Sequence, residues 1–81
     1  MADVKKRYPY QDIILQIMAE NKMKSQTEFA DSIGVNRDRV SNWINGRSDI
    51  DIDSLIAISE KYGLSIDYLL GRIKENIPLL I

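Results

Sequence analysis

The sequence predicts an all-α domain of five short helices. Apolar residues recur three and four positions apart in each expected helix, and no stretch shows the apolar–polar alternation of a strand. All four glycines follow the ends of these apolar patterns, where a left-handed residue commonly ends a helix. Both prolines lie outside the patterns. Periodicity and helix-stop signals therefore indicate the same segments.

The first expected helix covers about residues 10–21, because isoleucines and a methionine recur there at helical spacing. The second begins after Ser25, whose spacing to Glu28 is that of a capping box, and it ends at Gly34. Each of the three later helices has a favourable N-cap residue at its start. These residues are Asn36 for a helix running to Asn45, Asp51 or Asp53 for the fourth helix, and Ser65 for a last short turn.

Composition places the chain among ordinary globular proteins, since 44% of its 81 residues are apolar and 28% are charged. No apolar run approaches the roughly 20 residues that cross a bilayer, and the charged N-terminus does not resemble a signal peptide, so we expect a cytoplasmic protein without a membrane partner. Histidine and cysteine are absent. The usual general base, the thiol nucleophile and most zinc ligands are therefore missing, and we expect neither an enzyme nor a cofactor or metal.

The net charge of −1 is unevenly distributed along the chain. Residues 22–47 carry five bases and three acids, whereas residues 48–81 carry six acids and three bases. A phosphate backbone responds to the local field and not to the pI of the whole chain, so this composition is compatible with a nucleic-acid partner. An ordinary mixed surface would account for the charges equally well.

The second and third expected helices are joined as in a helix-turn-helix over residues 25–46. Gly34 turns the chain, Val35 is expected to enter the helix interface, and Ala30 lets the two helices approach closely. In such a motif the first helix braces the second, and the second enters the major groove of DNA.

The third expected helix has one apolar face and one polar face. Val40, Trp43 and Ile44 recur at the spacing of a buried face, so we expect Trp43 in the core and not as a stacking platform for single strands. On the other face, arginine suits guanine and asparagine suits adenine. Asparagine, serine and aspartate lower helix propensity, so their concentration indicates a role beyond helix formation. These outer residues are Arg37, Asp38, Ser41, Asn42 and Asn45.

These residues resemble the Cro/CI-type (XRE-like) helix-turn-helix family of phage repressors and bacterial regulators. The resemblance covers nearly the whole folded part. It implies a compact five-helix lambda-repressor-like fold and a dimeric transcriptional regulator, a repressor, that reads a near-palindromic operator in double-stranded DNA. The matching elements, in the family's order, are Gln26, Phe29-Ala30, Gly34-Val35, Val40-Ser41, Trp43, Gly46 and Asp67-Tyr68-Leu69-Leu70-Gly71.

The resemblance also implies roles for single residues. Base contacts are expected from Arg37, Asp38, Asn42 and Arg39. Phosphate contacts are expected from Gln26, Thr27, Ser41, Asn45, Arg47 and Lys24. For Gln26 and Thr27 the free N–H groups of a helix N-terminus favour an anion independently of the family.

Two positions need separate interpretation. Asp38 is either a first-turn acid favoured by the helix dipole or a specificity residue that orients Arg37 or accepts a hydrogen bond from cytosine. An arginine of the first helix commonly pairs with a glutamate near the end of the third helix in the family. The corresponding residues are Ala19 and Ile44, so we expect an apolar brace in place of the ion pair.

We expect the chain to consist of an N-terminal arm at 1–9, the helix-turn-helix domain at 10–72 and an apolar tail at 73–81. The basic residues 5–7 either form a flexible arm that contacts DNA phosphates or belong to a solvated terminus. The tail is expected to contact a second subunit, to pack on its own domain, or to begin a longer linker. With the acidic segment 49–53, it also supports an alternative function, an antitoxin or other interaction module whose main partner is a protein.

Overall fold

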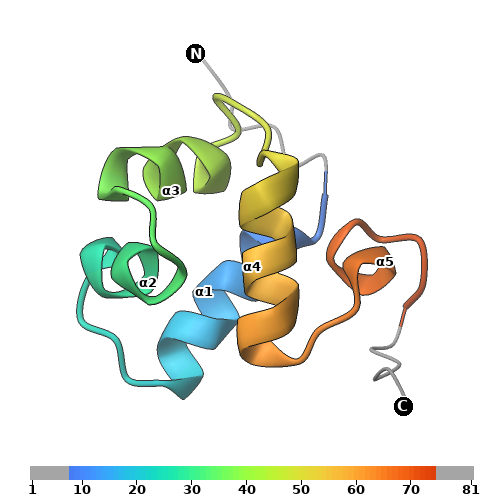
Figure 1. Cartoon of the computed structure of the whole chain (residues 1–81), viewed down its shortest axis with the longest axis horizontal. Helices are drawn as coiled ribbons and strands as arrows, with labels where there is room; N and C mark the ends of the chain where they lie inside the picture. Colours follow the sequence, from blue (N-terminus) through green and yellow to red (C-terminus); the bar gives the residue numbers. More distant parts are fainter. Residues whose placement is uncertain (1–7, 75–81) are drawn as a thin grey trace.

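The computed structural model describes residues 8–74, and this part of the chain forms five helices and no strand (Figure 1). The all-α prediction is confirmed. The expectations for the basic run 5–7 and for the apolar end of the tail lie outside the described residues. None of the helices in the described part is both long and apolar enough to cross a membrane. The helices are α1 (Tyr10–Glu20), α2 (Gln26–Ile33), α3 (Arg37–Ile44), α4 (Ile52–Tyr62) and α5 (Ile66–Leu69).

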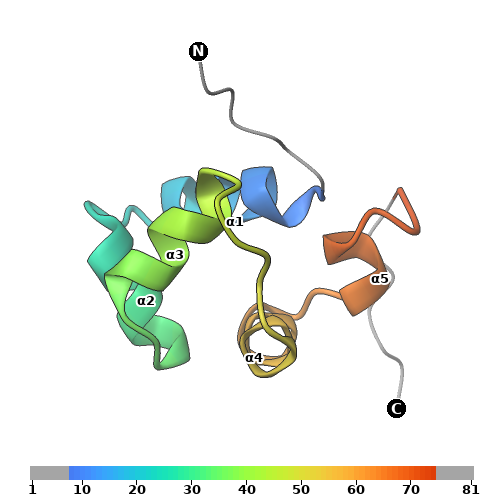
Figure 2. The ribbon, with the colours of Figure 1, turned by 90° about the horizontal axis from the view of Figure 1, so that it is seen from above.

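The helices enclose a single core to which each of them contributes. In Figure 1, α4 lies in front of α1, with α2 and α3 on one side and α5 on the other. The view from above shows the same order, with α4 seen along its axis (Figure 2). Each helix places at least one side chain in the core with no exposed surface, and the largest of these are Ile14, Phe29, Val40, Ile58 and Leu69. Burial of these apolar side chains is the main term that holds α3 in place.

Three of the expected N-caps are formed. The side chains of Asn36, Asp51 and Ser65 accept hydrogen bonds from the backbone N–H three residues further on, at 3.0, 3.1 and 3.1 Å. Each bond satisfies one of the N–H groups that a helix start leaves without an intrahelical partner. Of the two candidates for α4, Asp51 is therefore the cap.

The expected capping box at the start of α2 is not formed. The side chain of Ser25 makes no capping hydrogen bond. The carboxylate of Glu28 accepts instead from the backbone N–H of Lys24 at 3.0 Å. The sequence spacing is correct, but Glu28 reaches one residue further back than the motif requires.

The expected brace between Ala19 and Ile44 is also wrong. Ile44 packs against the core, but Ala19 is exposed; on α1 the neighbouring, half-buried Met18 is the residue that packs against the core. An error of one residue in register turns a helical side chain by about 100°. The polar link between α1 and α3 is made by Gln11, whose Nε2 donates to the carbonyl oxygen of Trp43 at 2.9 Å in the interior.

Gly71 ends the described fold in close contact with its beginning. Its φ is +81°, and a Cβ at this position would lie 2.9 Å from Cδ and Cγ of Pro9. We expect Gly71→Ala to lower the unfolding free energy by about 1–3 kcal/mol, because it combines left-handed strain with overpacking. Urea denaturation measures this loss.

Gly63→Ala is the matched control, since its φ is +67° but a Cβ there would meet nothing within 4 Å. It carries only the left-handed strain and should cost less than Gly71→Ala. Equal losses in the two variants would show that the contact with Pro9 contributes nothing.

Candidate nucleic-acid interface

The turn between α2 and α3 has the geometry expected of a helix-turn-helix. Gly34 has φ +78°, and a Cβ there would contact nothing within 4 Å, so glycine is required by the backbone conformation and not by lack of space. The N–H of Val35 donates to the carbonyl oxygen of Ala30 at 3.0 Å. Ala30 is fully buried, as expected where two helices approach closely. The helices lie side by side in both views (Figures 1 and 2).

The inner face of α3 fixes the helix to the rest of the domain. Val40 has no exposed surface and Trp43 is 2% exposed, so Trp43 is a core residue, as predicted, and offers no stacking platform. The carbonyl oxygen of Trp43 also accepts the hydrogen bond from Gln11. A helix held by its inner face presents its outer side chains from a rigid element.

The outer face of α3 carries the predicted polar residues. With about 100° between successive residues, Asp38 and Asn42 lie opposite the buried face, and Arg37 and Arg39 lie on the two flanks. Arg37, Asp38 and Arg39 are exposed, while Ser41, Asn42 and Asn45 are half-buried.

Both arginines of α3 form ion pairs in the free protein. Nη2 of Arg37 lies 3.3 Å from Oδ1 of Asp38, and Nη1 of Arg39 lies 3.9 Å from Oδ1 of Asp51. Each of these four side chains is at least 40% exposed. Exposed pairs of this kind contribute about 0–1 kcal/mol, so DNA groups can compete for the guanidinium groups. The first pair is the contact that the specificity interpretation of Asp38 requires.

The segment that follows α3 is held at both ends. Nδ2 of Asn45 donates to Oγ of Ser41 at 3.2 Å, so these two predicted phosphate contacts bind each other in the free protein. At the other end, the N–H of Ile50 donates to the hydroxyl of Tyr10 at 3.1 Å. Arg47 lies between these ends, exposed, and has no ion-pair partner within residues 8–74.

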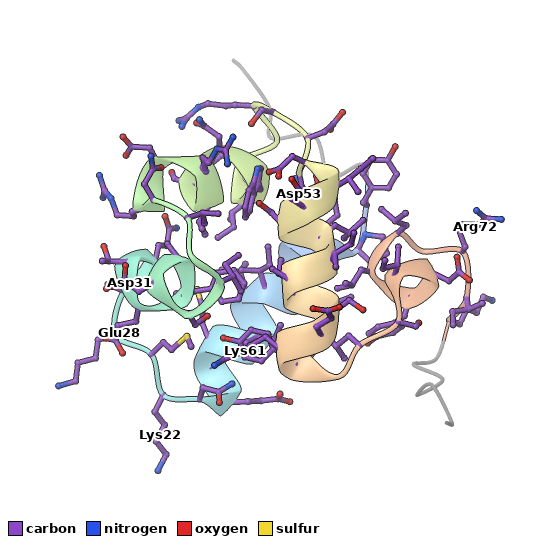
Figure 3. All side chains as sticks on the ribbon, viewed as in Figure 1. Lys22, Glu28, Asp31, Asp53, Lys61 and Arg72 are labelled. Atoms are coloured by element: carbon purple, nitrogen blue, oxygen red, sulfur yellow. The ribbon has the colours of Figure 1, made fainter. Side chains whose placement is uncertain are left out.

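The start of α2 presents Gln26, which is half-buried, and Thr27, which is exposed. Lys24 precedes them and is also exposed. Lys22 belongs to the same basic segment of the sequence but lies on the opposite side of α2 from α3 (Figure 3). The bases of residues 22–47 therefore do not form one continuous patch, and the charge of the two arginines of α3 is offset by Asp38 on the same helix and by Asp51 at the start of α4.

Asp51 pairs with Arg39 of the interface, and this pairing was not predicted from the sequence. Partial burial raises the pKa of its carboxyl, but hydrogen bonds from the hydroxyl and N–H of Ser54 and the charge of Arg39 outweigh this, and the pKa lies below its ordinary value. The sequence predicts Asp51 only as a helix cap. Its pairing with Arg39 has no local signal, because the two residues belong to different helices.

The depressed pKa makes the contribution of Asp51 depend on pH. A carboxylate with a lowered pKa in the folded state stabilises the protein above its unfolded-state pKa, about 3.9, and this stabilisation is lost as the pH falls through the folded-state value. We expect Asp51→Ala to cost about 0.5–2 kcal/mol at pH 7, mostly through the lost cap. The difference from the wild type should shrink below about pH 4. Urea denaturation across pH 3–7 measures it, and a difference independent of pH would contradict the assignment.

The fold and the turn define a helix-turn-helix protein, and comparison with known families agrees. A family model described as helix-turn-helix matches residues 15–69, more than half of the chain. The chain therefore belongs to the XRE-type helix-turn-helix family of DNA-binding transcriptional regulators.

Two curated relatives show the same class. An uncharacterized HTH-type transcriptional regulator of Haemophilus influenzae is 36% identical over 57 residues, which cover 69% of this chain and 24% of the relative. The HTH-type transcriptional regulator ImmR of Bacillus subtilis is 35% identical over 48 residues, which cover 59% of this chain and 38% of the relative. The chain thus spans well under half the length of either relative. No solved structure gave a significant match.

Proposed function

We propose that the protein binds a specific double-stranded DNA sequence as a dimer, through the major groove, and represses transcription there. The observation that carries this proposal is the outer face of α3, where Arg37, Asp38 and Asn42 project from a helix whose inner face is fixed in the core. One helix of this length contacts few base pairs. Two copies with recognition helices about 34 Å apart would read two half-sites of a near-palindromic operator.

The proposed contacts fall into two groups. Arg37, Asp38 and Asn42 read base edges, and the resemblance implies a further base contact from Arg39 at the edge of the same face. Contacts to the DNA backbone position the domain and carry no sequence information. The residues proposed for the backbone are Gln26, Thr27, Ser41, Asn45, Arg47 and Lys24. The domain that performs this is residues 10–72, with its motif at 25–46.

The ion pairs on α3 make this interface only weakly positive in the free protein. Nonspecific affinity comes almost wholly from neutralised phosphates, and each such contact steepens the log–log salt dependence by about one unit. We therefore expect weak binding to random duplexes and a large share of the affinity from base contacts and dimerisation.

Selection from a pool of random duplexes, with the solution mass of the bound and free protein, tests the proposal. The expected result is enrichment of two related half-sites one helical turn apart and a mass of two chains on the selected site. Weak and equal binding to all duplexes would overturn the proposal. Enrichment of a single half-site with one bound chain would retain DNA reading and overturn the dimer.

A second candidate function is a protein-interaction module, such as an antitoxin. It is favoured by Ile52, which is 74% exposed, and by Ile56 one turn later on α4. Acidic Asp49 and Asp53 flank this surface. If a protein partner copurifies, Ile52→Asp should release it and Arg37→Ala should not. Loss of the partner in Arg37→Ala alone would place that partner on the DNA-binding face.

A further inference from the structure

Arg39 and Asp51 link the recognition helix to the start of the next long helix. Arg39 lies on the flank of α3 beside the buried Trp43, and Asp51 is the N-cap of α4. The 3.9 Å separation of Nη1 and Oδ1 brings the guanidinium group to the α4 side of α3. This position is at the edge of the outer face and away from Asp38 and Asn42 at its centre.

Asp51 is the fixed member of this pair. Its Oδ2 accepts from the N–H of Ser54 at 3.1 Å, and its Oδ1 accepts from the hydroxyl of Ser54 at 2.8 Å. Ser54 is 3% exposed. The preceding residue, Ile50, is held by the hydroxyl of Tyr10, which belongs to α1. The carboxylate is therefore anchored on both sides, whereas Arg39 has a long side chain that is 56% exposed.

We propose that Asp51 is a positioning residue for Arg39, which it holds at the edge of α3 so that the guanidinium meets the DNA backbone and not a base edge. The resemblance to repressors implies a base contact for Arg39, whereas its pair with Asp51 on the α4 side of α3 favours a backbone contact. The proposal rests on the proposed function, since it concerns how the same interface meets DNA.

The pair has a consequence for specificity. In the free protein Asp51 offsets the charge of Arg39 and limits the directions in which this side chain reaches. Without the carboxylate, the charge of Arg39 would be uncompensated, and its side chain would contact any nearby phosphate. Binding to random DNA should then strengthen more than binding to the selected site, where the wild-type Arg39 already contacts the backbone.

Asp51→Asn tests this without removing the helix cap, because asparagine caps as well as aspartate. We expect the affinity for a random duplex to rise roughly 2- to 5-fold, the range of an exposed ion pair, and the ratio of selected to random affinity to fall. Fluorescence anisotropy with both duplexes measures the two affinities. Asp51→Ser is a second cap-competent variant, and unfolding midpoints verify that each variant is folded.

Asp53→Asn is the matched control. Asp53 lies in the first turn of the same helix, is exposed, and has no ion-pair partner among the described residues. Asp53→Asn removes the same charge but leaves the pair between Asp51 and Arg39 intact. It should raise the affinity for a random duplex less than Asp51→Asn does. An equal rise in the two variants would show a general charge effect and overturn the proposal, as would no rise in Asp51→Asn.

Arg39→Gln completes the test. If Asp51 acts through Arg39, Asp51→Asn should have no further effect on binding in the Arg39→Gln background. A rise that persists there would overturn the proposal. Arg39→Gln alone should weaken the selected duplex more than random duplexes and lower the salt slope on the selected duplex by about one unit, with no change of preference at any single base position. Loss of preference at one base position would instead assign Arg39 to a base edge.

NMR relaxation of the Arg39 Nε–Hε group in the free protein tests the positioning role without DNA. It therefore separates this proposal from the proposed function. Its order parameter should fall in Asp51→Asn and stay unchanged in Asp53→Asn. An unchanged value in Asp51→Asn would overturn the positioning role. If the wild type shows no preference among duplexes, the proposed function fails, while a fall in the order parameter would still show that Asp51 holds Arg39.

Discussion

Replacing Trp43 by alanine should lower the unfolding free energy by about 3–5 kcal/mol, the usual cost of removing a buried aromatic side chain. Trp43 is 2% exposed and lies on α3 itself, against a core to which all five helices contribute. Domains of this size have a total stability of about 5–15 kcal/mol, so this loss is a large part of the whole. DNA binding should be lost together with the fold.

Circular dichroism during urea denaturation measures this effect, since the variant has lost its only tryptophan. Trp43→Phe is the control, because it keeps an aromatic ring and the backbone carbonyl that accepts from Gln11. It should cost less and retain binding to a selected duplex. A Trp43→Ala variant that is as stable as the wild type but does not bind DNA would place Trp43 in the interface and contradict its burial.

The helices could be predicted from the sequence because their signals are local. Asn36, Asp51 and Ser65 cap the helices that follow them, and Gly34 takes the left-handed conformation that ends α2. The end of α1 has no such signal. There Lys22 adopts φ +54° without being glycine, a conformation that most side chains disfavour.

The types of residue in the candidate site could be predicted from the sequence, but the contacts between them could not. The polar face of α3 follows from helical periodicity, and the exposed Arg37 lies on a flank of that face. The pair between Arg39 and Asp51 depends on how α3 and α4 are placed relative to each other. The error at Ala19 has the same origin, since which face of α1 is buried depends on how α1 is placed against the other helices.

Arg37→Ala should weaken binding to the selected duplex by about 1–3 kcal/mol, roughly 5- to 150-fold, and relax the preference at one base position. A guanidinium bound bidentately to guanine O6 and N7 accounts for both effects. Anisotropy titrations against single-base variants of the selected site measure them. Arg72→Ala is the matched control. It removes the same charge from the far side of the molecule (Figure 3) and should change binding little. In the free protein Arg72 pairs with Asp67 at 3.7 Å.

Arg37→Lys and Asp38→Ala distinguish a base contact from a phosphate contact at the same position. Lysine keeps the charge but not the planar fork, so a bidentate base contact should be lost in Arg37→Lys while a phosphate contact should survive. Asp38 lies 3.3 Å from Arg37 and restrains that fork. Its removal should therefore relax the base preference more than it changes affinity. If Asp38→Ala instead strengthens binding to all duplexes equally, Asp38 only repels phosphates, and the preference must come from Arg37 and Asn42 alone.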